Sequence, residues 1–173
     1  GNTNLILSII KLIEDKMNIE HDIEEAGVQM ILLVEDSVRF YSSILPNLYS
    51  YILVQSKRFS TEALNRHSAT MRMRGRPKVV LARNYEEALA LYEKYKDNTL
   101  GVISDAQFPV NGKKDPEAGL KLLRAIRAED EYVPLIMESS DSENRQRAEA
   151  EGFRFVDKNS KKMSIDLRRL MEA

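Results

Sequence analysis

The sequence contains no cysteine and no tryptophan, and none of its apolar runs is long. The absence of cysteine excludes disulfides and thiolate metal sites, which disfavours a disulfide-stapled extracellular scaffold. A membrane span needs about 20 consecutive apolar residues. The N-terminal apolar stretch at 5–10 ends at Lys11 and has no basic leader, so we expect neither a span nor a signal peptide. A formal net charge of -1 disfavours a globally basic nucleic-acid binder. We therefore expect a cytoplasmic protein with no membrane partner.

Short apolar runs are present instead, and most of them end in a polar residue. These runs and the residues that follow them are 30–34 with Glu35 and Asp36, 100–104 with Asp105, 133–138 with Ser139, and 153–157 with Lys158. Together with a further run at 78–82, they alternate with helical patterns. This alternation predicts an α/β fold, a doubly wound parallel sheet of five strands with right-handed crossovers. A chain of 173 residues is long enough for one such domain.

The polar residues at the strand ends predict a common site. In an open parallel sheet, ligands bind outside the carboxyl ends of the strands. Carboxylates, a hydroxyl and an ammonium from four separate segments should therefore meet in one cleft. Such a set of groups suits a phosphoryl-accepting site assisted by a metal ion.

Local signals place the starts of three helices. Asn84, three residues before a glutamate, predicts a capping box. Asp115 is followed by a proline, which predicts an N-cap with proline at the first helical position. Ser140, also three residues before a glutamate, predicts the cap of the next helix, and a final helix is expected over 161–172.

The segment before the first strand predicts a helix over residues 4–25. It carries two basic and six acidic residues. We place a boundary between this segment, residues 1–27, and a domain over residues 28–173. The helix either packs on that domain or serves as a linker or dimerisation helix.

The first crossover is unusually long. Residues 37–69 predict a helix that Pro46 should kink, and we expect an insertion at about 46–77. Within it, residues 57–78 carry seven basic residues against one acid. This stretch is a solvated face or loop, a dock for an acidic partner, or a nucleic-acid contact. Phe59 is its only aromatic residue, which disfavours the last reading.

Taken in order, the polar strand ends make residues 29–172 resemble the receiver domain of two-component response regulators, which is CheY-like and flavodoxin-like, (βα)5, in fold. Asp105 and Pro109 resemble the ends of the family's Asp-x-x-x-Pro loop, which makes Asp105 the implied phosphoacceptor. Ser139 and Lys158 occupy the positions of the family's switch hydroxyl and lysine. Phe155 occupies that of its rotating aromatic residue, although ordinary packing explains a phenylalanine there equally well.

The resemblance also implies a cofactor, Mg²⁺. Asp36, Asp105 and the backbone carbonyl of Gln107 would coordinate the ion, and Glu35 would act mainly through metal-bound water. Gln107 and Asp141 flank the site and would set the lifetime of the aspartyl phosphate. The surface over 141–173 would report the phosphorylated state.

The sequence departs from the receiver pattern at three places besides the insertion. Pro109 lies far from the next suitable glycine, Gly119, which lengthens the loop beside the site. Asn159 follows Lys158 where receivers usually have proline, and Glu35 replaces an aspartate. Residues 72–78 and 101–105 resemble receivers attached to phosphoenolpyruvate-synthase-like or pyruvate-phosphate-dikinase-like proteins.

The resulting hypothesis is a phosphorelay signalling module of a two-component system, not a turnover enzyme. Its implied partners are a sensor histidine kinase or phosphotransfer protein, a fused or separate output domain, and a second copy in a homodimer. One alternative is a degenerate pseudo-receiver that serves as an interaction platform. Another is a small Mg²⁺-dependent phosphatase, which ranks low because Gln107 stands where the common phosphatase signature has a second aspartate.

Overall fold

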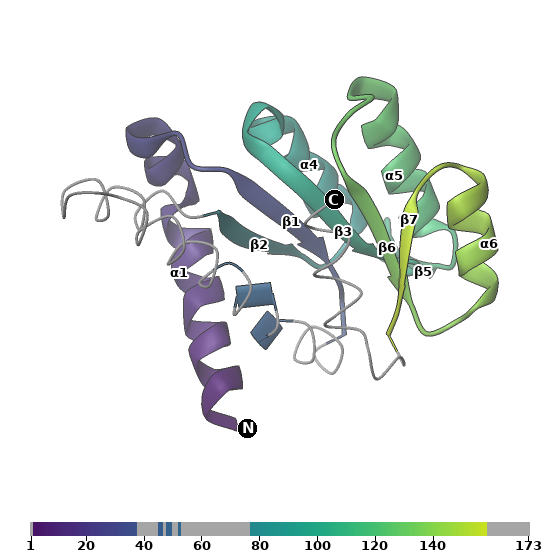
Figure 1. Cartoon of the computed structure of the whole chain (residues 1–173), viewed down its shortest axis with the longest axis horizontal. Coiled ribbons are helices and arrows are strands. Elements are labelled where there is room, and N and C mark those ends of the chain that lie inside the picture. Colours follow the sequence, from purple (N-terminus) through teal and green to yellow (C-terminus); the bar gives the residue numbers. More distant parts are fainter. Residues whose placement is uncertain (1, 38–44, 47, 50–51, 53–76, 159–173) are drawn as a thin grey trace.

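The computed structural model describes residues 2–37, 45–46, 48–49, 52 and 77–158. A five-stranded parallel sheet with strand order β2-β1-β3-β6-β7 forms its centre (Figure 1). The strands are β1 (Met30–Val34), β2 (Lys78–Ala82), β3 (Thr99–Asp105), β6 (Leu135–Ser139) and β7 (Arg154–Asp157). The predicted flavodoxin-like α/β fold is therefore confirmed.

Helices and one small hairpin complete the described chain. The helices are α1 (Asn2–Ala26), α4 (Tyr85–Tyr95), α5 (Ala118–Glu129) and α6 (Glu143–Ala150), with the short 3₁₀ helix η1 (Lys96–Asn98). The strands β4 (Phe108–Val110) and β5 (Lys113–Asp115) pair antiparallel and form a separate sheet. In the described part of the chain, no helix has both the length and the apolar character needed to cross a membrane.

The sheet is buried on both faces, as expected for parallel strands that read as continuous apolar runs. One face packs on α4, α5 and α6, through residues such as Tyr92, Leu123 and Ala148. The other face packs on helical residues of the first crossover, among them Leu45, Leu48, Tyr49 and Ile52. All five side chains of β1, the second strand in the sheet order, are buried.

The structure confirms one of the three predicted helix starts. The side chain of Asn84 accepts a hydrogen bond from the Glu87 amide at 2.8 Å and caps α4. The other two predictions are wrong. Asp115 accepts a hydrogen bond from the Glu117 amide in a turn, and α5 begins only at Ala118. The N-cap position of α6 is held by Ser142 and not by Ser140, and the Ser142 side chain makes no capping hydrogen bond.

The N-terminal helix α1 packs against the edge strand β2, and Figure 1 shows it beside that strand. The buried carboxylate of Asp15 accepts hydrogen bonds from the Val79 amide at 2.8 Å and from the Tyr49 hydroxyl at 2.9 Å. The Lys78 ammonium lies 3.8 Å from Asp15 and 3.1 Å from Asp22. An edge strand otherwise exposes unpaired amides, and Asp15 provides an acceptor for one of them, the Val79 amide.

Parts of the first crossover and of the chain's end lie outside the described residues. Leu45 and Pro46, Leu48 and Tyr49, and Ile52 are helical. The predicted kink at Pro46, most of the insertion at 46–77 and the final helix at 161–172 fall on residues that are not described. They stay predictions.

Candidate functional site

A row of charged residues continues one apolar face of the sheet at the carboxyl ends of its strands. Alternate residues of a strand point to the same face. Leu33, Ile103, Ile136 and Val156 belong to the core on one face. The residues two positions further along each chain segment are Glu35, Asp105, Glu138 and Lys158. Asp105 of β3 is the direct partner of Glu138 in the register of β6. The four charged side chains therefore gather at the carboxyl ends of the strands, where the sequence predicted a site.

Lys158 bridges two of these carboxylates. Its ammonium lies 2.5 Å from Oε2 of Glu35 and 2.9 Å from Oδ1 of Asp105. Its backbone amide donates to the Ser139 carbonyl at 3.0 Å, which ties the end of β7 to the end of β6. Glu35, Asp105 and Lys158 are all buried at the side chain, with exposed fractions of 0%, 10% and 5%. The predicted neighbours are thus brought together at contact distance.

Burial and neighbouring acids raise the pKa of two carboxyl groups in this cluster, Asp105 and Glu138. Burial and the neighbouring Glu35 raise the pKa of Asp105 to about 6, although Lys158 and the Ala106 amide oppose the rise. Burial raises the pKa of Glu138 well above its usual range, and Glu35 and Asp105 contribute to the rise. The pKa of Lys158 is raised: burial lowers it, but the carboxylates of Glu138, Asp105 and Glu35 together outweigh burial. A compact positive charge placed here would relieve the repulsion among the acids.

Three carboxylates can hold a cation. Glu35, Asp36 and Asp105 each offer an oxygen, and these oxygens lie within 4.8 Å of one another. Oδ1 of Asp36 is buried, and no hydrogen-bond partner for it is found among the described residues. A buried polar oxygen without a partner is costly, so this atom fits the role of an unused ligand. Carboxylate oxygens are the ligands that Mg²⁺ prefers, and the residues present fit this ion.

The loop after Asp105 contains the antiparallel hairpin β4–β5, which the sequence analysis did not predict. Its turn is Asn111-Gly112, with φ angles of 53° and 81°. An Asn-Gly pair with positive φ at both positions favours a two-residue hairpin turn, so this signal could have revealed the hairpin. Lys114 of β5 reaches back to the site, where its ammonium lies 3.9 Å from Oδ2 of Asp36.

The hairpin explains the long spacing between Pro109 and Gly119. After the hairpin, the chain returns to the site, and the Gly119 amide donates to the Ala106 carbonyl at 2.9 Å. A Cβ atom on Gly119 would lie 2.3 Å from the Asp105 carbonyl oxygen. Only a glycine fits so close an approach. Gly119 therefore packs against the loop that carries Asp105 despite the extra residues between them.

Ser139 and Asp141 make local contacts at the start of α6. The Ser139 hydroxyl is buried and accepts hydrogen bonds from the Asp141 amide at 3.1 Å and from the Asn144 side-chain amide at 2.9 Å. The carboxylate of Asp141 accepts a hydrogen bond from the Glu143 amide at 3.0 Å. The switch role of Ser139 and the modulating role of Asp141 are not tested by these contacts and stay predictions.

Phe155 is buried in the core between the sheet and α6. The Arg145 guanidinium lies over its ring, 4.9 Å from the ring centre. This contact is within the range of a cation–π interaction. Both earlier readings of Phe155 remain open, because a buried ring suits ordinary packing and also one position of a rotating side chain.

Gln107 lies between β3 and β4, and its side chain is exposed. Coordination of an ion by its backbone carbonyl, and an effect of its side chain on the site, stay predictions. Two residues that the sequence analysis did not assign to the site lie in it or beside it, namely Glu138 and Lys114. A glutamate inside an apolar strand was a signal for the first, because buried acids are rare without a partner. No local signal pointed to Lys114.

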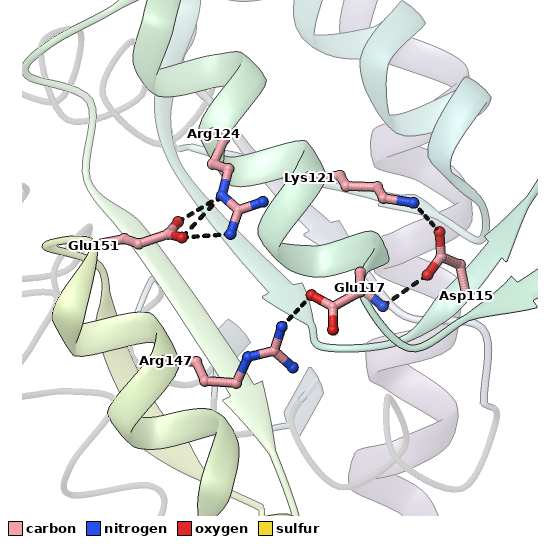
Figure 2. A network of polar contacts seen from close by, with 6 residues as sticks. All are labelled: Asp115, Glu117, Lys121, Arg124, Arg147 and Glu151. Atoms are coloured by element: carbon pink, nitrogen blue, oxygen red, sulfur yellow. Dashed lines mark hydrogen bonds and ion pairs between the residues drawn. The ribbon is translucent and has the colours of Figure 1, made fainter.

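A network of charged residues connects the hairpin to the helices beside the site (Figure 2). The carboxylate of Asp115, at the end of β5, contacts the Lys121 ammonium at 2.5 Å. Glu117, just before α5, pairs with Arg147 of α6. Arg124 donates two hydrogen bonds of 2.9 Å from Nε to the carboxylate of Glu151. These contacts tie β5 to α5, and α5 to α6 and the residue that follows it.

Comparisons with known proteins agree with this architecture. No protein-family model matches the sequence, and no curated protein matches it either. Among solved structures, a response regulator receiver domain protein from Clostridium thermocellum is similar, with 19% identity and a TM-score of 0.54 over 84% of this chain and 92% of that one. The chemotaxis protein CheY4 of Vibrio cholerae has 18% identity and a TM-score of 0.53 over 84% of this chain and 97% of its own. The chain therefore has the CheY-like fold of response-regulator receiver domains.

Proposed function

We propose that this chain is a phosphoacceptor receiver domain of a two-component or phosphorelay system, and that Asp105 accepts the phosphoryl group. The observation that carries the proposal is the contact of 2.9 Å between Asp105 and the Lys158 ammonium, inside a buried cluster of acids. A receiver needs a carboxylate nucleophile, a cation to offset its charge and a lysine for the phosphoryl oxygens. Residues at three separate strand ends can meet these needs: Asp105 after β3, Lys158 after β7, and Glu35 and Asp36, which would hold the cation with Asp105, after β1.

The transfer step follows from the chemistry of these groups. A carboxylate oxygen of Asp105 forms a bond to phosphorus as the bond from phosphorus to a donor nitrogen or oxygen breaks. The leaving group keeps the electron pair and takes a proton. Lys158, which already contacts Asp105, pairs with an oxygen of the transferred group as a compact point charge. When bound by Glu35, Asp36 and Asp105, Mg²⁺ supplies neutralisation of the negative charge shared by donor and acceptor.

The switch would act through the end of β6. A new negative charge on Asp105 favours a hydrogen bond from the Ser139 hydroxyl, which now accepts bonds from the Asp141 amide and Asn144. A shift of Ser139 would release these contacts at the start of α6 and give Phe155 room to move. The reporting surface is the one over 141–173, of which the structure describes residues 141–158.

The partners follow from the function. A sensor histidine kinase or phosphotransfer protein in the cytoplasm would supply the phosphoryl group, and a fused or separate output domain would read the surface. Attachment to a phosphoenolpyruvate-synthase-like protein stays a prediction. So do the boundaries of a domain over 28–173 and a linker or dimerisation helix over 1–27. The role of the basic stretch 57–78, which lies almost wholly outside the described residues, also stays a prediction.

Intact mass after incubation with acetyl phosphate and Mg²⁺ tests the proposal. We expect a hydrolytically labile adduct of one phosphoryl group in the wild type, and none with Asp105→Asn or with EDTA. Asp97→Asn, a substitution in η1 before the amino end of β3, is the matched control and should keep the adduct. No adduct in the wild type would favour the pseudo-receiver. An adduct that persists in Asp105→Asn would refute the assignment of the acceptor, and sustained release of phosphate from a phosphomonoester would favour the phosphatase.

A further inference from the structure

Helix α1 carries apolar side chains on two opposite faces. Its inner face contributes Ile19, which is 4% exposed, and the partly buried Leu12 and Ile23 to the two cores. Its outer face presents Leu7, Ile10, Ile13 and Met17, which are 50%, 46%, 55% and 77% exposed. In the described part of the chain, four of the six large hydrophobic residues that are exposed lie on this one helix. A helix that only packs on its own domain needs one apolar face, so the outer face is left without a structural explanation.

The outer face is held in place. Asp15 fixes the rotation of α1 through its hydrogen bonds to the Val79 amide and the Tyr49 hydroxyl. Lys16, beside it, pairs with Glu87 of α4 at 3.1 Å. Rotation of α1 to bury the outer residues would break these contacts. The apolar stripe is therefore a permanent feature of the surface, and such stripes mark sites of interaction.

We propose that this outer face, the residues Leu7, Ile10, Ile13 and Met17, binds the same face of a second copy with the two helices antiparallel. The stripe is self-complementary about a twofold axis near residue 12. Leu7 of one copy then lies opposite Met17 of the other, and Ile10 lies opposite Ile13. A twofold interface requires this property, since each patch must match itself.

The charged residues beside the stripe support this arrangement. The same twofold axis brings Lys11 of each copy opposite Glu14 of the other, so that two pairs of opposite charge flank the apolar contact. Glu14 is exposed and Lys11 is partly exposed, so both are accessible to a second copy. Parallel packing would instead place this flank of the two helices on opposite sides of the contact, so that Lys11 of one copy would not face Glu14 of the other. The charges therefore favour the antiparallel orientation.

The size of the contact predicts a weak and reversible dimer. The stripe spans 11 residues, or roughly 16 Å of helix. A contact along so short a stretch of one helix buries less surface area than the roughly 1,200 Å² that stable interfaces bury. The two helices also repel each other, because α1 has six acidic residues against two lysines. We expect a dissociation constant on the order of 100 µM.

Sedimentation equilibrium of the whole chain over a range of concentrations tests the interface. Neither Mg²⁺ nor a phosphodonor is present, so the result does not depend on the proposed phosphorylation. We expect the wild type to dimerise, Ile10→Glu to stay monomeric, and the control Tyr132→Glu, at an 85% exposed apolar residue elsewhere, to dimerise as the wild type does. Circular dichroism checks that each variant is folded. A wild type that is monomeric at about 1 mM, or an Ile10→Glu variant that still dimerises, would overturn the proposal.

Charge reversal tests the orientation. Lys11→Glu alone places acids opposite acids in the dimer, and Glu14→Lys alone places lysines opposite lysines, so each variant should be monomeric. An equimolar mixture of the two restores both pairs between unlike copies and should give a heterodimer. An effect within one helix cannot produce this rescue, because neither chain regains an opposite charge of its own. A mixture that stays monomeric would rule out the antiparallel arrangement.

Discussion

Asp105 is one of three buried carboxyl groups that surround a single lysine. Its carboxylate accepts a hydrogen bond from the Ala106 amide at 2.8 Å and lies 2.9 Å from the Lys158 ammonium. The pKa of Asp105 is nevertheless raised to about 6. Burial and the charge of Glu35 outweigh these two favourable contacts. At neutral pH the folded protein therefore holds a carboxylate that would be more stable in water. Sites that bind a cation or transfer a group commonly store energy in this way.

Removal of this charge should stabilise the fold. The pKa of Asp105 is about 6 in the folded protein against 3.8 for a free side chain, so its ionisation penalises the folded state. The penalty is complete above about pH 6 and disappears as the pH falls towards 4. We expect Asp105→Asn to raise the free energy of unfolding by roughly 1–3 kcal/mol at pH 7, with a smaller gain at pH 5. Urea unfolding of the wild type and the variant at pH 7 and at pH 5 measures this gain. A gain that does not change with pH would contradict this account.

Gly119 should not tolerate a side chain. A Cβ atom would meet the Asp105 carbonyl oxygen at 2.3 Å and the Ala106 Cα at 2.9 Å, and both are backbone atoms that cannot turn away. We expect Gly119→Ala to destabilise the protein by roughly 1–3 kcal/mol, as overpacking does. Thermal unfolding gives the measurement. Gly101→Ala is the matched control, because a Cβ there meets its nearest atom at an ordinary 3.5 Å.

The hairpin β4–β5 is an element that brings a positive charge to the acidic cluster. Lys114 lies 3.9 Å from the carboxylate of Asp36, and its own side chain is 56% exposed. Exposed pairs of this kind contribute little to stability. They still compete with a cation for the same oxygen. The contact of Lys114 would therefore tune the site while adding little to the stability of the fold.

Loss of Lys114 should tighten the binding of Mg²⁺. We expect Lys114→Ala to lower the dissociation constant about twofold to fivefold, a change that corresponds to less than 1 kcal/mol. Isothermal titration with Mg²⁺ gives the constant. Lys113→Ala removes the same charge from the neighbouring exposed residue and controls for net charge. Equal effects of the two substitutions would mean that the contact with Asp36 has no specific role.

Asp15 should make α1 an integral part of the fold. With Asp15→Ala, the Val79 amide and the Tyr49 hydroxyl lose their acceptor, and Lys78 loses one of its two acidic neighbours. We expect a loss of roughly 2–4 kcal/mol in urea unfolding. Lys16→Ala, which breaks only the exposed pair with Glu87, should cost less than about 1 kcal/mol. A loss of less than about 1 kcal/mol for Asp15→Ala would show that the hydrogen bonds of Asp15 to Val79 and Tyr49 are not needed to hold α1 on the sheet.

At the scale of the whole molecule, the sheet and the clustering of charged residues at the carboxyl ends of its strands could be predicted because each depends on a local pattern. Apolar runs identify strands, and the residue after each run lies at the common edge. The helix starts at Asp115 and Ser140 were wrong because the chain there forms turns whose amides bond to Asp115 and Asp141. The contact of Lys114 with Asp36 could not be predicted, since it depends on where the hairpin lies in space.

The acidic cluster also predicts how the whole molecule responds to a cation. An ion that binds only the folded state stabilises it by mass action, by about 2.7 kcal/mol when its free concentration is 100 times its dissociation constant. We expect Mg²⁺ to raise the melting temperature of the wild type. The rise should be lost in Asp36→Asn and kept in Asp97→Asn. A rise that survives in Asp36→Asn would place the ion elsewhere.

The hairpin and the absence of cysteine together offer a way to observe the site. Gly119 closes the loop on Ala106 on the far side of the hairpin, so the tip can carry an attachment without strain on the acceptor loop. A single cysteine introduced beside the tip, as in Lys113→Cys at the start of β5, would be the only thiol in the chain. A fluorescent dye on that thiol would stand one residue from Lys114. Its emission would then report when a metal ion displaces Lys114 from Asp36. The signal could be followed in real time and in a mixture with unlabelled partners.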